Sequence, residues 1–205
     1  MIRVKVCGLT RPQDAALAAE AGAWAVGLVF CRRSPRFINA AQARAICAVL
    51  PKTVLRVGVF MDQSLETVRK VAADIPLDLI QLHGAEPDSF CLALGEKRCI
   101  KAFVLRSAGD AERAESCPAE YLLADRSRSE PEAPGPAQWM MAGALAEKRR
   151  TLLAGGLTPD NVAEAVAAAK PWGVDVSGGL EAAPGIKDPD RVRVFFAALR
   201  RTEAG

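Results

Sequence analysis

Two side chains stand at the ends of apolar runs, where acid–base chemistry could take place. Cys7 closes the run RVKVC, and Asp125 closes the run YLLAD. A thiol near a helix N-terminus or a cation can lose its proton and act as a base, but free cysteine is also among the most commonly buried residue types. A carboxylate that loses part of its solvation has a raised pKa, which suits a general acid; alternatively, an aspartate here caps a loop. The pattern alone leaves these alternatives open.

Glycines occur in pairs in two later stretches, AGGLTPDN (154–161) and VSGGLEAAPG (176–185). The paired residues are Gly155, Gly156, Gly178 and Gly179. Glycine lets backbone N–H groups approach an anion closely, and the N-terminus of a following helix adds a favourable dipole. One such pair could serve only the turn before a helix. Two pairs at neighbouring strand ends indicate a phosphate site, so we expect a phosphorylated small molecule as the ligand.

Two further side chains could orient a substrate. Arg36 lies in RRSPRFI (32–38), where Pro35 restrains the loop, and its guanidinium could bind a carboxylate or phosphate through two parallel hydrogen bonds. His83 is the only histidine of the chain and follows the run LDLIQL. The alternatives are a surface arginine and a histidine that hydrogen-bonds a loop, and the sequence does not separate them.

The composition argues against several other classes of protein. The 205 residues carry a formal net charge of +3, and no basic cluster is interleaved with aromatic residues, so we expect no nucleic-acid partner. No apolar run reaches the roughly 18–20 residues that span a bilayer, and Arg3 and Lys5 argue against a signal peptide. Six cysteines without a CxxC pair and a single histidine disfavour a metal site. We therefore expect a cytoplasmic protein with free thiols and no membrane partner.

Apolar, strand-like runs alternate with alanine-rich, helix-like runs along the whole chain. Residue types that favour helix ends mark several of the helices: we expect Gly22 to end the first, Ser64 to cap the third, and Thr158 with Pro159 to begin the seventh. The eight expected strands cover residues 3–7, 23–30, 53–60, 77–83, 98–105, 120–125, 150–155 and 172–178.

The expected strands are nearly continuous apolar runs, as in parallel strands that helices cover. Eight strand–helix units predict an α/β protein that forms a single (β/α)8 TIM barrel over residues 1–205, with an open doubly wound sheet as the rival. The active site of such a barrel lies at the C-terminal ends of its strands. That geometry would bring the candidate residues together, and it makes residues 126–137 a loop at the same end.

Motifs that span the whole chain resemble the phosphoribosylanthranilate isomerase family of tryptophan biosynthesis. The matching stretches are KVCGLT (5–10), SPRFI (34–38), RVGVF (56–60), QLHG (81–84), IKAF (100–103), LLAD (122–125), AGGLTPDNV (154–162) and GVDVSGGLEAAPGIKD (173–188). The resemblance implies a (β/α)8 barrel, in agreement with the pattern of strands and helices.

The resemblance also implies the reaction and the roles of the residues. The enzyme would be an intramolecular oxidoreductase that converts phosphoribosylanthranilate to 1-(2-carboxyphenylamino)-1-deoxyribulose 5-phosphate by an Amadori rearrangement, without a metal or organic cofactor. Asp125 would be the general acid, Cys7 the general base, and Arg36 the ligand of the anthranilate carboxylate. The remaining substrate-binding residues would be His83, Gly155, Gly156, Asp175, Ser177, Gly178 and Gly179.

The chain departs from the family pattern in two places. The family has a glycine-rich, lysine-containing stretch after the sixth strand, where this chain has SRSEPEAPGPAQW (127–139) and keeps only the tryptophan. The stretch VSGGLE replaces the usual VSSGVE, so Gly178 lacks a hydroxyl that could reach the phosphate while its N–H can still donate. Substrate contacts in both places are therefore left open.

Two rival functions remain. One is another phosphosugar isomerase on the same barrel, such as the ProFAR isomerase of histidine biosynthesis. Because that enzyme resembles a design with a pair of catalytic carboxylates, it should have an aspartate where this chain has Cys7. The other is a catalytically idle barrel that only binds a phosphorylated ligand. The sequence also leaves a homodimer open.

Overall fold

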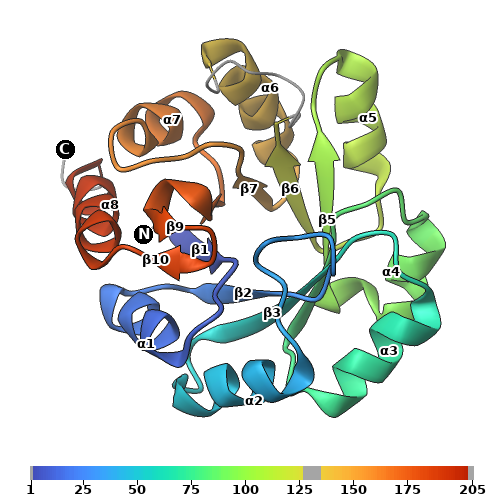
Figure 1. The fold of residues 1–205 in the computed structure, drawn as a ribbon. Helices are drawn as coiled ribbons and strands as arrows, with labels where there is room; N and C mark the ends of the chain where they lie inside the picture. The colour runs from blue at the N-terminus through green and yellow to red at the C-terminus, as the bar shows by residue number, and fades with distance from the viewer. Residues whose placement is uncertain (1, 127–134, 203–205) are drawn as a thin grey trace.

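The computed structural model, which describes residues 2–126 and 135–202, confirms the predicted (β/α)8 barrel (Figure 1). Eight parallel strands follow one another in chain order, and β1 also pairs with β8 through Lys5 and Asp175, which closes the sheet and rules out the open alternative. The strands are β1 (Arg3–Cys7), β2 (Ala25–Val29), β3 (Leu55–Phe60), β4 (Leu79–Leu82), β5 (Cys99–Val104), β6 (Tyr121–Asp125), β7 (Thr151–Leu153) and β8 (Gly173–Val176).

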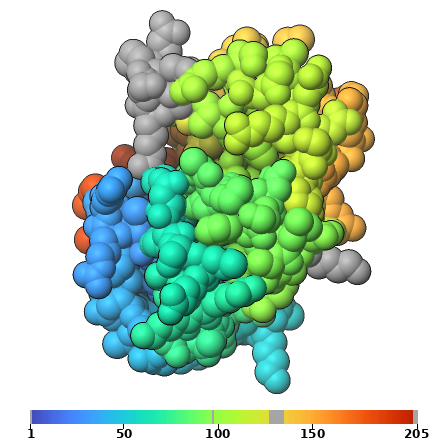
Figure 2. Space-filling model, turned by 90° about the vertical axis from the view of Figure 1, so that its right-hand side faces the viewer, coloured from blue at the N-terminus to red at the C-terminus, as the bar shows by residue number. Residues whose placement is uncertain are grey.

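A ring of helices surrounds these strands, and the side view in Figure 2 shows α3, α4 and α5 as a continuous outer wall. The helices are α1 (Pro12–Ala21), α2 (Ala40–Val49), α3 (Leu65–Asp74), α4 (Asp88–Leu94), α5 (Ala108–Ser116), α6 (Pro136–Ala146), α7 (Val162–Ala169) and α8 (Pro189–Thr202), with short 3-10 turns η1 (Glu96–Arg98) and η2 (Gly178–Leu180). Within the described ranges, none of these helices has the length and apolar character that crossing a membrane requires.

The helix ends follow the sequence signals in two of three cases. Gly22 ends α1 in the left-handed conformation, and the Ser64 hydroxyl accepts the Thr67 N–H at the start of α3, both as predicted. The predicted start of α7 at Thr158 and Pro159 is wrong, because the helix begins only at Val162. The cause is the Asn161 side chain, which accepts the N–H of Thr158 and thereby holds the preceding residues in a turn.

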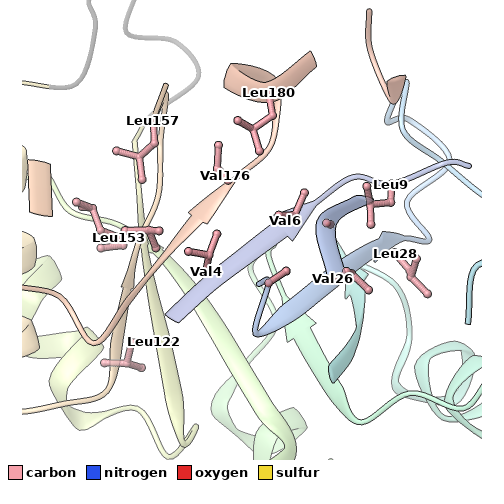
Figure 3. Close-up of a cluster of buried hydrophobic side chains, with 14 of the residues drawn as sticks. Val4, Val6, Leu9, Val26, Leu28, Leu122, Leu153, Leu157, Val176 and Leu180 are labelled. Atoms are coloured by element: carbon pink, nitrogen blue, oxygen red, sulfur yellow. The ribbon is translucent and has the colours of Figure 1, made fainter. Parts of the chain in front are cut away.

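Buried side chains cover both faces of the strands, which is why apolar and polar residues do not alternate in the sequence. The outward side chains Val4, Val6, Val26 and Leu28 pack against the helices in the large core drawn in Figure 3. The inward ones form a separate apolar layer inside the barrel. This layer contains Ala25, Val57, Leu79, Ile100, Leu123 and Leu152. The apolar layer supports the polar residues that stand nearer the C-terminal ends of the same strands.

A small hairpin, formed by β9 (Glu181–Ala183) and β10 (Ile186–Lys187), follows β8 and was not predicted. The sequence pattern shows only a glycine-rich loop there. The hairpin lies beside the end of β1 (Figure 1). From there, the Lys187 side chain contacts Cys7, and the Glu181 side chain contacts Arg36.

Candidate active site

A cavity of about 430 Å3 opens at the C-terminal ends of the strands. It brings together all ten residues that the sequence predicted for the site, contributed by six of the eight strand ends. They are Cys7, Arg36, His83, Asp125, Gly155, Gly156, Asp175, Ser177, Gly178 and Gly179. Their position agrees with the general rule for barrels of this kind. The volume suits a small organic ligand.

The two glycine pairs form one concave edge of this cavity. Gly155 and Gly156 both have left-handed backbones, with φ of 87° and 80°, which side chains rarely allow. A side chain on Gly179 would overlap the carbonyl oxygen of Leu157, so the two loops touch through bare backbone. Gly178 differs from the other three, because a Cβ there would have only Arg36 nearby, at 3.5 Å. Three of the glycines are therefore required by the shape of the edge, and backbone N–H groups so arranged suit a phosphate.

Cys7 ends β1 with its thiol against β2, and only 7% of the residue is exposed. It pairs in register with Gly27, and a Cβ on Gly27 would lie 2.5 Å from the sulfur. Gly27 therefore provides the space that the thiol occupies. Sequence reasoning missed this residue, because a glycine within a strand gives no sign of what faces it.

A buried cation stands one inward position below Cys7 on the same strand. Lys5 is fully buried, and its Nζ donates to Oδ1 of Asp175 at 2.7 Å. Burial alone lowers the pKa of Lys5, but the charges of Asp175 and Cys7 outweigh it and raise that pKa, so Lys5 stays charged. Burial raises the pKa of the Cys7 thiol, and the charge of Lys5 partly opposes that rise. Among the charges that act on Cys7, that of Lys5 favours the thiolate most.

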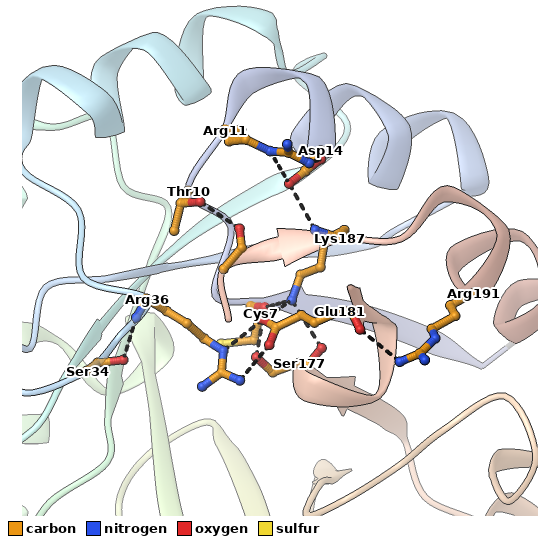
Figure 4. A network of polar contacts seen from close by, with 11 residues as sticks. Cys7, Thr10, Arg11, Asp14, Ser34, Arg36, Ser177, Glu181, Lys187 and Arg191 are labelled. Atoms are coloured by element: carbon orange, nitrogen blue, oxygen red, sulfur yellow. Dashed lines mark hydrogen bonds and ion pairs between the residues drawn. The ribbon is translucent and has the colours of Figure 1, made fainter. Parts of the chain in front are cut away.

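The hairpin after β8 supplies a second charged network beside Cys7 (Figure 4). Arg36 donates two hydrogen bonds to Glu181, at 2.8 Å to Oε1 and at 2.6 Å to Oε2, and Lys187 donates to the same Oε1 at 2.9 Å. Lys187 also donates to the backbone oxygen of Cys7 at 2.7 Å, as the Ser177 hydroxyl does at 3.1 Å. These five hydrogen bonds connect the end of β1 and the Arg36 side chain in one network. Neither Glu181 nor Lys187 was predicted from the sequence as part of the site.

The pKa values within this network follow from burial and charge together. Burial raises the pKa of Glu181, but Arg36 and Lys187 outweigh it and hold the carboxyl pKa below its usual value. Burial lowers the pKa of Lys187, although Glu181 opposes that change. Arg36 uses Nε and one terminal nitrogen of its guanidinium to bind Glu181. The rest of the guanidinium lines the cavity.

His83 and Asp125 meet on the opposite side of the cavity. Nε2 of His83 lies 3.1 Å from Oδ2 of Asp125, and each side chain is about one-fifth exposed (18% and 19%). The backbone N–H of Arg126 donates to the other carboxylate oxygen at 2.8 Å. Nδ1 of His83 in turn lies 2.9 Å from the amide nitrogen of Gln81. Gln81 is a residue that the sequence analysis did not single out.

Of the predicted loop after β6, residues 127–134 lie outside the described part of the chain. Trp139, the residue that the stretch keeps from the family pattern, lies in α6 and is 3% exposed. Its side chain packs in the hydrophobic core and does not line the cavity.

Comparisons with known proteins identify what this fold and site resemble. Residues 4–198 match the family model described as N-(5'phosphoribosyl)anthranilate (PRA) isomerase. An N-(5'-phosphoribosyl)anthranilate isomerase of Geobacter metallireducens is 44% identical over the full length of both chains, and one of Geobacter sulfurreducens is 46% identical over 96% of this chain and 97% of its own.

Solved structures agree with these relatives. A phosphoribosyl anthranilate isomerase from Thermus thermophilus superposes with a TM-score of 0.89 at 41% identity, over 98% of this chain and 99% of its own. Another, in complex with reduced 1-(o-carboxyphenylamino)-1-deoxyribulose 5-phosphate, gives a TM-score of 0.87 at 37% identity, over 98% and 100%. Both sequence and structure match over nearly the whole chain. The chain therefore belongs to the N-(5'-phosphoribosyl)anthranilate isomerase family.

Proposed function

We propose that this protein converts N-(5'-phosphoribosyl)anthranilate to 1-(2-carboxyphenylamino)-1-deoxyribulose 5-phosphate, in tryptophan biosynthesis. The observation that carries the proposal is the placement of Cys7 and Asp125 around one cavity whose edge is the glycine cradle. A sugar phosphate anchored on that edge would lie between a thiol and a carboxyl group. The solved relative that holds a reduced form of the product supports the same ligand class.

The first step is the opening of the sugar ring. The phosphate binds the backbone N–H groups of the loops after β7 and β8, which contain Gly155, Gly156, Gly178 and Gly179. Asp125 delivers a proton to the furanose ring oxygen, while the lone pair of the anilino nitrogen expels that oxygen from C1′. The product of this step is an open-chain iminium ion and the Asp125 carboxylate. The N–H groups of His83 and Arg126 then stabilise the new carboxylate.

The second step moves a hydrogen from C2′ to C1′. The iminium ion acidifies the C2′ proton, so Cys7 removes it in its ionised form, which the Lys5 charge favours against burial. The sulfur then carries that proton, and the electrons of the broken C–H bond neutralise the iminium nitrogen. The resulting enolamine loses the proton of its 2′-hydroxyl and gains one at C1′, which yields the ketone. Because oxidation at C2′ balances reduction at C1′ within one molecule, the stoichiometry requires no metal or organic cofactor.

Substrate contacts to Arg36, His83, Asp175 and Ser177 belong to the same proposal, since all four line the cavity. Arg36 would receive the anthranilate carboxylate on the guanidinium edge that Glu181 leaves open. The Asp175 carboxylate already accepts from Lys5, which restricts it to one orientation toward the sugar.

The experiment that tests this function follows the fluorescence of phosphoribosylanthranilate as purified protein consumes it. We expect Cys7→Ala and Asp125→Asn each to lower kcat by at least roughly 1,000-fold while the circular dichroism spectrum is unchanged. Cys47→Ala in α2 and Asp190→Asn in α8 are the matched controls, because both side chains lie outside the cavity. A wild-type protein without turnover would instead support an idle, ligand-binding barrel.

Three further properties belong to this proposal. We expect residues 1–205 to unfold as one domain and the enzyme to act in the cytoplasm, where its six free cysteines would remain reduced. We also expect a homodimer, because a Thermotoga maritima relative, 36% identical with a TM-score of 0.86, is described as dimeric. Sedimentation equilibrium measures the oligomeric state directly.

A further inference from the structure

Three polar side chains form a line inside the barrel, from its interior to the cavity. Gln81 and His83 stand two residues apart, at the inward face and the end of β4, and Asp125 ends β6. The amide nitrogen of Gln81 lies 2.9 Å from Nδ1 of His83, and Nε2 of the same ring lies 3.1 Å from Oδ2 of Asp125. In the proposed function, Asp125 is the general acid and His83 donates a hydrogen bond to it, but Gln81 has no role.

The surroundings of Gln81 favour one orientation of its amide. The residue is 1% exposed, and its Oε1 has no hydrogen-bond partner among the described residues. Turning the amide by 180° would place the oxygen on His83 and leave the NH2 group buried in the unpartnered position. A buried N–H without an acceptor is rarer in proteins than an unpartnered carbonyl oxygen. The orientation in which Gln81 donates to Nδ1 is therefore the favoured one.

A donor at Nδ1 decides where the proton of the neutral ring lies. A nitrogen that accepts a hydrogen bond carries no proton, so the ring proton lies on Nε2 and points at Asp125. We propose that Gln81 is a positioning residue that holds His83 in its Nε2–H tautomer, so that the ring donates to Asp125 as that carboxyl group gives up its proton. The opposite tautomer would turn a lone pair toward the new carboxylate and repel it. This proposal rests on the proposed role of Asp125 as the general acid.

The single histidine of the chain allows a direct spectroscopic test. In the full-length, 15N-labelled protein, a long-range 1H–15N spectrum contains one imidazole, whose two nitrogen shifts report which atom carries the proton. We expect a protonated Nε2 and a hydrogen-bonded, unprotonated Nδ1. In Gln81→Met, which has a similar length but no donor, the Nδ1 shift should move to that of a free imine nitrogen. In Gln81→Glu, whose carboxylate can only accept, Nδ1 should become protonated. Gln13→Met, on the exposed face of α1, is the control.

Kinetics show whether the tautomer matters for the reaction. We expect Gln81→Met to lower kcat roughly tenfold with KM unchanged, the size expected when one hydrogen bond to the developing charge is weakened. In a His83→Gln background, an amide N–H replaces the ring donor, so a further Gln81→Met substitution should not lower kcat again. This non-additivity distinguishes positioning through His83 from a general loss of packing, which would add to the first effect.

The spectra are recorded without turnover, so they remain informative even if the enzyme does not act on phosphoribosylanthranilate. A wild-type ring protonated on Nδ1 would overturn the proposal, as would Nδ1 shifts in Gln81→Met and Gln81→Glu that match the wild type. A changed shift with unchanged kcat would also overturn it, because the tautomer would then have no part in catalysis. Should Gln81→Glu not fold, Gln81→Met alone decides the spectroscopic outcome.

Discussion

The two ends of the barrel interior are built from the same strands but hold side chains of opposite character. At the N-terminal end, Trp24, Tyr121 and Trp172 pack with ring centroids 5.0–5.7 Å apart. At the C-terminal end, Cys7 and Asp125 face a cavity, and each is held by polar neighbours. The aromatic end contributes stability through buried area. The polar end loses solvation, so its groups require partners in fixed positions.

Reactivity therefore depends on the polar end, whereas both ends contribute to stability. A substitution at the aromatic end should lower the free energy of unfolding with little effect on kcat. A substitution at the polar end should change kcat, KM or the reactivity of the thiol.

Among substitutions of residues that support the reacting groups, Gly27→Ala should have the largest effect. The added methyl group would lie 2.5 Å from the Cys7 sulfur and 3.0 Å from its Cα, so the thiol must move. A displacement of about 1 Å of a reacting group lowers turnover by roughly 100-fold or more. Steady-state kinetics measure this loss in kcat, and Gly109→Ala in α5 is the control because a Cβ there meets nothing closer than 3.8 Å. A kcat equal to that of the control would show that the thiol position does not matter.

Lys5→Met should affect both stability and the thiol. Asp175 would remain as a charge without its buried partner, which costs about 3–5 kcal/mol of unfolding free energy. Without the cation, burial and Asp175 would raise the pKa of Cys7 further, so the midpoint pH of its alkylation by iodoacetamide should rise. Mass spectrometry of the Cys7 peptide measures that midpoint.

The control for this variant is Lys101→Met, which removes another buried lysine, paired with Glu86 at 2.8 Å. We expect a similar loss of stability but an unchanged alkylation midpoint. Equal alkylation midpoints in the two variants would show that Lys5 does not control the ionisation of the Cys7 thiol.

Trp172→Ala tests the aromatic end. The ring packs edge-on against Trp24 and lies under the Arg3 guanidinium at 4.5 Å, so its loss should lower the unfolding free energy by about 3 kcal/mol. Denaturant unfolding measures the change. We expect kcat and KM to stay within twofold of the wild type at a temperature where the variant is folded. A loss of kcat comparable to that of Gly27→Ala would show that the aromatic end also contributes to reactivity.

The smallest effect is expected from Gly178→Ser. The position has room for a side chain, and the new hydroxyl could donate to the phosphate, so KM should fall roughly two- to fivefold with kcat unchanged. Gly179→Ser provides the contrast, since its side chain would overlap Leu157 and raise KM. An increased KM in Gly178→Ser would mean that the cradle depends on bare backbone at all of its positions.

Much of this molecule could be predicted from local sequence patterns. Continuous apolar runs and regular helix-like segments identified the barrel, because parallel strands under helices are buried on both faces. The rule that active sites gather at the C-terminal strand ends placed Cys7, Asp125 and the glycine pairs in one cavity. The roles of these residues stay predictions until turnover is measured. The start of α7 was predicted wrongly, since the Asn161 side chain competes with the helix there.

Local sequence patterns were enough to predict the strand order, the caps of most helix ends that they marked and the types of side chain at the mouth of the barrel. The partners of those side chains follow from the tertiary structure. Lys5 meets Asp175 across 170 residues of sequence, and Lys187 reaches Cys7 across 180. The space beside the thiol comes from Gly27 on a neighbouring strand. Electrostatic interactions and burial depend on distances of a few ångströms in space. The closure of the barrel sets these distances, and the spacing of residues along the chain does not.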